Sequence, residues 1–183
     1  MSHQAEDIRK PLVVMVMGLP GSGKTTLASN LAACLPAIHL SSDRLRIELD
    51  QRGQYDRAAK LKVYAYMEER MTQALAQGDS VVCDATFSRK EDRSRICHLA
   101  VEQRAPLYLI EAWAPASVIA ARMEQERPES EADYQVYLDV KAHFDPILQP
   151  HRRIDTSQGD PEQHLAEVLK YLTDGHPILA TTN

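Results

Sequence analysis

The chain has 183 residues, of which 44% are hydrophobic and 26% charged, and this size and balance fit one globular domain with its own core. The formal net charge of −5 and the sequence pI near 5.8 argue against a broad, non-specific grip on nucleic acid, which normally needs a basic excess. The longest apolar run, residues 12–19, is far shorter than the roughly 20 residues of a membrane-spanning helix, so no membrane partner is expected.

Cysteine and histidine usage gives little sign of cross-links or metal sites. The three cysteines, Cys34, Cys83 and Cys97, are odd in number and lack Cys-x-x-Cys spacing. We expect each to be a small buried thiol in a reducing, cytoplasmic setting. The histidines lack metal-ligand spacing, so the sequence assigns them no catalytic role. No small-residue cleavage site follows the charged N-terminal stretch, so a secretory signal is not expected.

From residue 12 onward, apolar strand-like runs alternate with amphipathic helical stretches, which predicts a parallel sheet covered by helices. In chain order, we expect a strand at 12–17, a helix at 24–35, a strand at 37–40, a helix from about 44, a helix at 56–77, a strand at 80–84, a helix at 89–104, a strand at 107–112, helices at 116–126 and 134–148, a strand at 153–155 and a helix at 161–172. The sequence therefore predicts one α/β domain with its core over about residues 12–172, a charged lid over about 122–134 and a loose tail over 173–183.

A complete phosphate-loop motif lies between the first expected strand and the first expected helix. Its residues are Gly18, Leu19, Pro20, Gly21, Ser22, Gly23, Lys24 and Thr25, with Thr26 directly after them. Glycines let successive backbone N–H groups turn toward phosphate oxygens, and the helix that begins near Gly23 adds the positive end of its dipole. Lys24 supplies a charge to the β- and γ-phosphates, and the Thr25 hydroxyl can coordinate Mg²⁺. ATP and Mg²⁺ are therefore the predicted cofactors.

Two aspartates lie at the carboxyl ends of expected strands. Because ligands bind beyond the carboxyl ends of the strands in open α/β sheets, Asp43 and Asp84 should approach the same crevice as the phosphate loop. Asp43 can accept the proton of an attacking hydroxyl, or it can serve only as a helix cap. Asp84 can hold Mg²⁺ or its water shell, or it can be a turn residue.

Three arginines are candidates for contacts with the substrates. Arg46 lies three residues after Asp43, so both can share one face of a helical turn, where Arg46 binds an acceptor group or is simply solvated. Arg122 and Arg127 flank the charged segment, where closure of a lid can bring a guanidinium onto the transferring phosphoryl group. Ion pairs with neighbouring glutamates are the alternative for both.

Five further residues permit two interpretations each. Asp155 and Thr156, after the last expected strand, either shape an adenine pocket or form an ordinary turn. Tyr55, Tyr64 and Tyr66 either line an acceptor groove or pack in the core, and core packing is the preferred interpretation for these tyrosines.

Together, these motifs resemble those of small P-loop kinases of the polynucleotide kinase, zeta-toxin and chloramphenicol phosphotransferase types. The resemblance covers about residues 12–172 and rests on the phosphate loop, on Ser42-Asp43 with Arg46, on residues 82–87 and on the arginines near the lid. It implies a three-layer P-loop fold with a five-stranded parallel sheet in the order 2-3-1-4-5. It also implies Asp43 as the base and Arg46 as an acceptor contact.

In such kinases a lid arginine steadies the γ-phosphate, and Arg122 is the first choice for this role. Arg122 and Arg127 stand one residue further apart than paired lid arginines commonly do, so the choice between them stays open.

The predicted function is ATP- and Mg²⁺-dependent transfer of the γ-phosphate to a hydroxyl of a small molecule or of a nucleic-acid end. The small chain favours transfer, because switch and motor proteins usually need additional partner-facing elements. The alternative is a nucleotide-dependent regulatory module, or an ATPase without a hydroxyl acceptor. The acidic charge favours a small acceptor, although a local basic cluster formed by Arg44, Arg46, Arg52 and Arg57 could receive a nucleic-acid phosphate.

Overall fold

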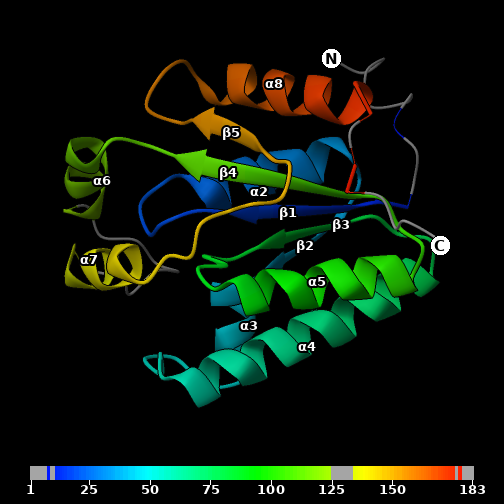
Figure 1. Ribbon diagram of the computed structural model, residues 1–183, viewed down its shortest axis with the longest axis horizontal. Coiled ribbons are helices and arrows are strands. Elements are labelled where there is room, and N and C mark those ends of the chain that lie inside the picture. Colours follow the sequence, from blue (N-terminus) through cyan, green and yellow to red (C-terminus); the bar gives the residue numbers. More distant parts are fainter. Residues whose placement is uncertain (1–7, 9–10, 125–133, 176, 179–183) are drawn as a thin grey trace.

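The computed structural model describes residues 8, 11–124, 134–175 and 177–178. Its centre is a five-stranded parallel sheet in the order β2-β3-β1-β4-β5 (Figure 1). The strands are β1 (Val13–Met17), β2 (Ile38–Ser41), β3 (Val81–Asp84), β4 (Leu107–Trp113) and β5 (Arg152–Asp155). The predicted sheet order 2-3-1-4-5 is therefore confirmed.

Helices cover both faces of the sheet, which gives the three layers that Figure 1 shows. The described helices are α2 (Lys24–Cys34), α3 (Ser42–Glu48), α4 (Arg57–Ala76), α5 (Lys90–Glu102), α6 (Ala116–Met123), α7 (Tyr134–Ala142) and α8 (Pro161–Thr173). The core of one face is built with α2 and α8, and the core of the other face with α4 and α5. Among these helices, none has both the length and the apolar character needed to cross a bilayer.

The central strand β1 explains the continuous apolar run in the sequence. All five of its residues are buried. Val14 and Val16 belong to the core beneath α2 and α8, whereas Met15 and Met17 belong to the core beneath α4 and α5. A strand covered on both faces needs apolar residues at every position, not at alternate ones. The phosphate loop therefore begins at the end of a strand that is packed on both faces.

The carboxyl ends of three neighbouring strands meet at one edge of the sheet. Val16 of β1 lies opposite Asp84 of β3, and Ser41 of β2 lies opposite the same residue from the other side. Asp43 follows Ser41 within the first turn of α3. The sheet therefore places both predicted aspartates at the edge where the phosphate loop begins.

One predicted helix is wrong at its C-terminal end. The pattern predicted a helix over 134–148, but α7 ends at Ala142. The following segment turns toward α5, because the buried Arg93 guanidinium donates hydrogen bonds to the carbonyls of Asp145 (3.1 Å) and Pro146 (2.8 Å). Proline also disfavours helical geometry in the residue before it, which here is Asp145. The prediction from hydrophobic periodicity did not take this into account.

The predicted C-terminal tail is partly ordered. Thr173 is the last residue of α8, and the Ile178 N–H donates to the Leu107 carbonyl at 2.7 Å, so the chain returns to the start of β4. The cysteines are all free thiols: Cys83 is buried, whereas Cys34 and Cys97 are only partly buried.

Most of the predicted lid, including Arg127, lies outside the described residues. The helix predicted over 116–126 is described as α6, which ends at Met123. The lid, and the division of the chain into a single kinase domain with a lid, therefore stay predictions.

Candidate functional site

The phosphate loop leaves the sheet through a glycine that no other residue can replace without strain. Gly18 has φ 153°, and a Cβ there would collide with the Ala112 carbonyl and lie 2.6 Å from Ser22 Oγ. The loop closes with a hydrogen bond from the Ser22 N–H to the Leu19 carbonyl at 3.1 Å. Gly23, with φ 85°, then starts α2 as its N-cap. The loop backbone is thus directed over the N-terminus of α2, where an anion is favoured.

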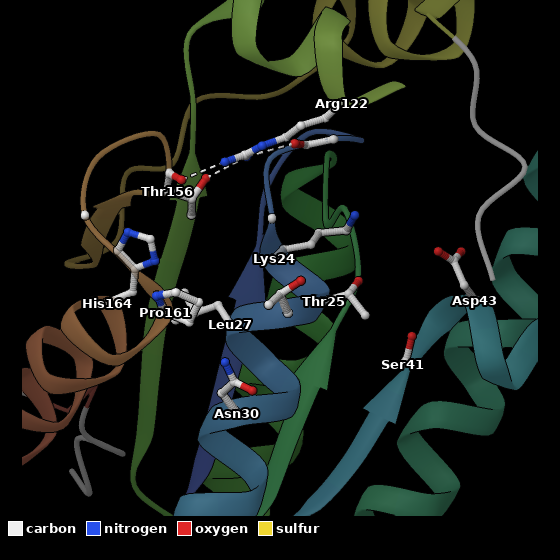
Figure 2. A pocket seen from close by; sticks show the side chains of 14 residues that line it. Lys24, Thr25, Leu27, Asn30, Ser41, Asp43, Arg122, Thr156, Pro161 and His164 are labelled. Atoms are coloured by element: carbon white, nitrogen blue, oxygen red, sulfur yellow. Dashed lines mark hydrogen bonds between the residues drawn. The ribbon is translucent and has the colours of Figure 1, made fainter. Parts of the chain in front are cut away.

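A cavity of about 690 Å³ opens around this N-terminus (Figure 2). From the loop and α2 it is lined by Gly21, Gly23, Lys24, Thr25, Thr26, Leu27 and Asn30, and from the rest of the chain by Ser41, Asp43, Arg122, Thr156, Gly159, Pro161 and His164. Figure 2 shows Lys24 and Thr25 at the start of α2, with Asp43 across the space from them. The volume lies in the ordinary range of ligand pockets, roughly 300–1,000 Å³.

The structure brings seven of the predicted site residues to this one cavity: Gly21, Gly23, Lys24, Thr25, Thr26, Asp43 and Arg122. Lys24, Thr25, Asp43 and Arg122 come from three separate segments of the chain and line the same space. The sequence prediction did not include Leu27, Asn30, Ser41, Gly159, Pro161 and His164 among the lining residues. Only Pro161 had a sequence signal, because it marks the first residue of the helix after β5.

Helix α3 positions the Asp43 side chain at the cavity. This side chain is 31% exposed, and its Oδ1 lies 3.5 Å from Arg46 Nη1 one turn later. Arg46 is buried and donates to the carbonyls of Gln54 (3.1 Å) and Ser42 (3.5 Å), with its guanidinium stacked over the Tyr55 ring. Arg46 therefore braces α3 and the carboxylate at its start, a role that the sequence interpretations did not include.

The three tyrosines take different places. Tyr64 is buried in the core and stacks on Phe87 with ring centroids 5.4 Å apart. Tyr66 packs against the same core, whereas Tyr55 is exposed at 46%. The preferred interpretation as core residues therefore fits Tyr64 and Tyr66 but not Tyr55.

Asp84 lies behind the cavity wall, on the sheet face that α2 covers. Val82, two residues earlier on β3, packs with Leu27 and Leu31 of α2, so alternation along the strand turns Asp84 to the same face. Its side chain is 1% exposed, and neither carboxylate oxygen has a hydrogen-bond partner. Buried carboxylate oxygens without partners are costly, and such a group is normally satisfied by a cation, water or donor.

These residues fit a Mg²⁺ ion. Hard oxygen ligands suit Mg²⁺, which proteins usually hold through one or two carboxylates together with substrate phosphates. The Thr25 hydroxyl and the unpartnered Asp84 carboxylate supply such oxygens on one face of the sheet. In the part of the chain that the structure describes, no cluster of three or more His, Cys, Asp or Glu is arranged to hold a metal by itself. The donor set therefore suits a metal shared with bound phosphates.

Arg122 reaches across the outside of the phosphate loop. Its guanidinium donates to the Thr156 carbonyl at 2.6 Å, to Thr156 Oγ1 at 2.9 Å and to the Gly21 carbonyl at 3.3 Å (Figure 2). The Thr156 hydroxyl in turn donates to the Ser22 carbonyl at 2.7 Å. Thr156 thus ties β5, α6 and the phosphate loop together, which is more than the simple turn that was one of its two predicted interpretations.

The turn after β5 forms the wall of the cavity opposite Asp43. The Ser157 hydroxyl and N–H both donate to Asp155 Oδ1, at 2.6 and 2.9 Å, and these hydrogen bonds lower the pKa of the Asp155 carboxyl. Next, Asp160 caps α8 by accepting from the Gln163 N–H at 2.9 Å. A braced turn and a capped helix give this wall a defined shape.

A phosphate loop on the central strand of a 2-3-1-4-5 parallel sheet, with helices on both faces, defines a P-loop nucleotide-binding protein. Residues 13–147 match the family model described as an AAA domain (AAA_33), and the chain belongs to this family. A curated relative, the uncharacterized protein Rv2004c of Mycobacterium tuberculosis, is 28% identical over 123 residues. The match covers 61% of this chain, which spans about a quarter (25%) of the length of that relative.

Solved structures share the fold over almost the whole chain. A sugar kinase from Janibacter sp. superposes with a TM-score of 0.69 at 23% identity, covering 88% of this chain and 94% of the other. The Mycobacterium tuberculosis APS kinase CysC, in complex with AMPPNP and APS, gives 0.72 at 18% identity, covering 91% and 99%. A gluconokinase from Sinorhizobium meliloti gives 0.64 at 17% identity, covering 92% and 99%. This chain therefore has the fold of these P-loop kinases.

Proposed function

We propose that this protein is a kinase that transfers the γ-phosphate of ATP, with Mg²⁺, to a hydroxyl of a small molecule or of a nucleic-acid end. The observation that carries the proposal is the position of Asp43. This carboxylate lines the same cavity as Lys24 and Thr25, from a different helix and across the space from them. A carboxylate in this position can accept the proton of a hydroxyl that attacks the γ-phosphate.

The chemistry follows from the groups around the cavity. The acceptor hydroxyl donates its hydrogen bond to Asp43, which takes the proton as the hydroxyl oxygen attacks the γ-phosphorus. The bond between the γ-phosphorus and the β–γ bridging oxygen breaks, and ADP leaves with that oxygen. Lys24 and the loop N–H groups stabilise the negative charge on the phosphate oxygens. A Mg²⁺ ion held by Thr25 and Asp84 would supply further positive charge to the same oxygens. Arg46, whose Nη1 lies 3.5 Å from Asp43 Oδ1, keeps Asp43 oriented, and a contact between Arg46 and the acceptor stays a prediction.

The comparisons support phosphotransfer as the reaction type. The sugar kinase, the APS kinase and the gluconokinase are all described as kinases, and the APS kinase structure contains AMPPNP and APS. Their acceptors differ, so the fold alone does not select one. The net charge of −5 favours a small acceptor over a long nucleic acid.

The test is transfer of label from γ-labelled ATP, with Mg²⁺, to a panel of nucleosides, 5′-hydroxyl oligonucleotides, sugars and hydroxylated antibiotics. Label on one acceptor class, lost in Lys24→Ala, would identify the substrate and support the proposal. We expect Lys24→Ala to lower transfer by about 10²-fold or more, because the loop loses its charge on the transferring phosphate. Release of inorganic phosphate alone, with no labelled acceptor, would favour the ATPase or regulatory alternative.

Arg122 is proposed to act on the transferring phosphoryl group after releasing Thr156. Arg122→Ala is then expected to lower kcat by about 10³-fold while the Kd of ATP changes by less than about fivefold. Steady-state kinetics and ATP titration separate these quantities. The control is Arg152→Ala, since Arg152 pairs with Glu167 at 2.6 Å and does not line the cavity. A raised Kd with an unchanged kcat would make Arg122 an anchor for the nucleotide instead.

A further inference from the structure

A largely buried histidine lies beside the Asp84 carboxylate. His39 lies on β2, and its Nε2 is 3.4 Å from Asp84 Oδ2. The two side chains are 10% and 1% exposed. The sequence offered no reason to select this histidine, because no metal-ligand spacing surrounds it.

The register of the sheet places the His39 and Asp84 side chains on the same face. His39 pairs with Val82 and Ser41 pairs with Asp84 along the β2–β3 ladder. Paired residues in neighbouring strands face the same side, so the imidazole lies on the face that carries Val82 and Asp84. That face is the one covered by α2, whose first turn carries Thr25.

The two side chains complement each other chemically. His39 Nε2 and both Asp84 oxygens are buried without a hydrogen-bond partner. A neutral imidazole with its proton on Nε2 is a donor, and a carboxylate is an acceptor. A small rotation of either ring or carboxylate would convert the 3.4 Å contact into a hydrogen bond and remove two unsatisfied groups at once.

We propose that His39 is a positioning residue for the metal site: its Nε2–H donates to Asp84 Oδ2, which would leave Oδ1 available to Mg²⁺ or its water shell. This inference rests on the proposed function, because it takes Asp84 as the carboxylate of the nucleotide-bound metal. Carboxylates that hold metals are usually fixed by such hydrogen bonds, and losing the outer partner typically weakens metal affinity by about 10–100-fold.

The test measures how strongly Mg²⁺ tightens ADP binding. The Kd of ADP is determined by calorimetry with excess Mg²⁺ and with EDTA, and the ratio of the two values reports the metal's contribution. His39→Leu is expected to reduce this ratio by about tenfold, while the Kd with EDTA stays within about twofold. His39→Gln, whose amide N–H can donate to the same oxygen, is expected to recover most of the ratio.

A matched control exists between β4 and the residue that precedes β5. His151 Nε2 lies 3.6 Å from Glu111 Oε2, a histidine–carboxylate contact of similar length that involves neither Asp84 nor Thr25. His151→Leu should leave the ratio unchanged. In the wild type with Mg²⁺ and ADP, nitrogen NMR should show a protonated, hydrogen-bonded Nε2 on His39, a measurement that needs no substitution to fold.

Three results would overturn the inference: an unchanged ratio in folded His39→Leu, a His39→Gln no better than His39→Leu, or an unprotonated Nε2 in the complex. None of these measurements needs an acceptor or phosphoryl transfer. A failed transfer assay with an intact Mg²⁺ effect would therefore overturn only the proposed function. If the Kd of ADP for the wild type were the same with Mg²⁺ and with EDTA, this inference would be overturned. The label assay would then test phosphoryl transfer independently.

Discussion

Asp43→Asn is expected to lower kcat for transfer by about 10²–10⁴-fold, the range that a positioned base contributes, while the Kd of ATP stays within about twofold. The amide keeps the size of the carboxylate but cannot take the proton of the acceptor hydroxyl. The side chain lies across the cavity from Lys24, so removing its charge leaves the phosphate loop intact. Transfer of label and ATP titration, measured on the same preparation, separate the two effects.

The control for this change is Asp174→Asn. Asp174 also forms an ion pair with a basic residue one turn away, since Lys170 Nζ lies 2.9 Å from its Oδ2, but it sits at the far end of α8. Its substitution should leave both kcat and the Kd of ATP unchanged. Full transfer activity in Asp43→Asn would remove Asp43 as the base and leave it as the first-turn residue of α3. An equal loss in both variants would indicate a general effect of lost ion pairs.

The fold was predictable from the sequence because its strongest signals are local. Burial of β1 on both faces requires an unbroken apolar run, and the phosphate loop must follow a strand and precede a helix. Once the strands are placed, the rule that parallel strands end at one edge brings Asp43 and Asp84 toward the loop. The structure meets this expectation for Asp43 fully, whereas Asp84 lies just behind the cavity wall.

The details that sequence could not supply depend on pairing between distant segments. The second strand was predicted at 37–40 and is observed as β2, Ile38–Ser41. The observed strand pairs Ser41 with Asp84 and His39 with Val82, a register that the predicted bounds did not contain. No local pattern specifies the register of a short edge strand so closely.

The contacts of two arginines were hidden for the same reason. Arg122 bonds to Thr156, which follows it by 34 positions, and Arg93 bonds to carbonyls more than 50 positions away. Helical periodicity reports which face of a segment is apolar, but not which carbonyl of another segment a long guanidinium will reach. The end of α7 was misplaced because Arg93 and Pro146 act on it from outside the periodic pattern.

Gly18→Ala is expected to abolish measurable ATP binding and to reduce the free energy of unfolding by about 3 kcal/mol or more. For a chain of this size, that loss corresponds to a fall in Tm of about 6–12 °C. The reason is steric: the added Cβ would collide with the Ala112 carbonyl oxygen and lie only 2.6 Å from Ser22 Oγ. Because a backbone carbonyl of β4 cannot rotate away, the loop or the strand must shift. Thermal melts and ATP titration measure the two effects.

Gly53→Ala separates this collision from the general cost of replacing a glycine. Gly53 also has a positive φ, 76°, but no atom lies within 4 Å of an added Cβ. We therefore expect a loss of only about 1 kcal/mol and unchanged ATP binding. If Gly18→Ala behaved like Gly53→Ala, the loop would not depend on its close approach to β4. A much larger effect at Gly18 would show that β4 sets the path of the phosphate loop. Met17 is the last residue of β1 that pairs with β4, opposite Glu111, and the next residue, Gly18, passes directly against the Ala112 carbonyl.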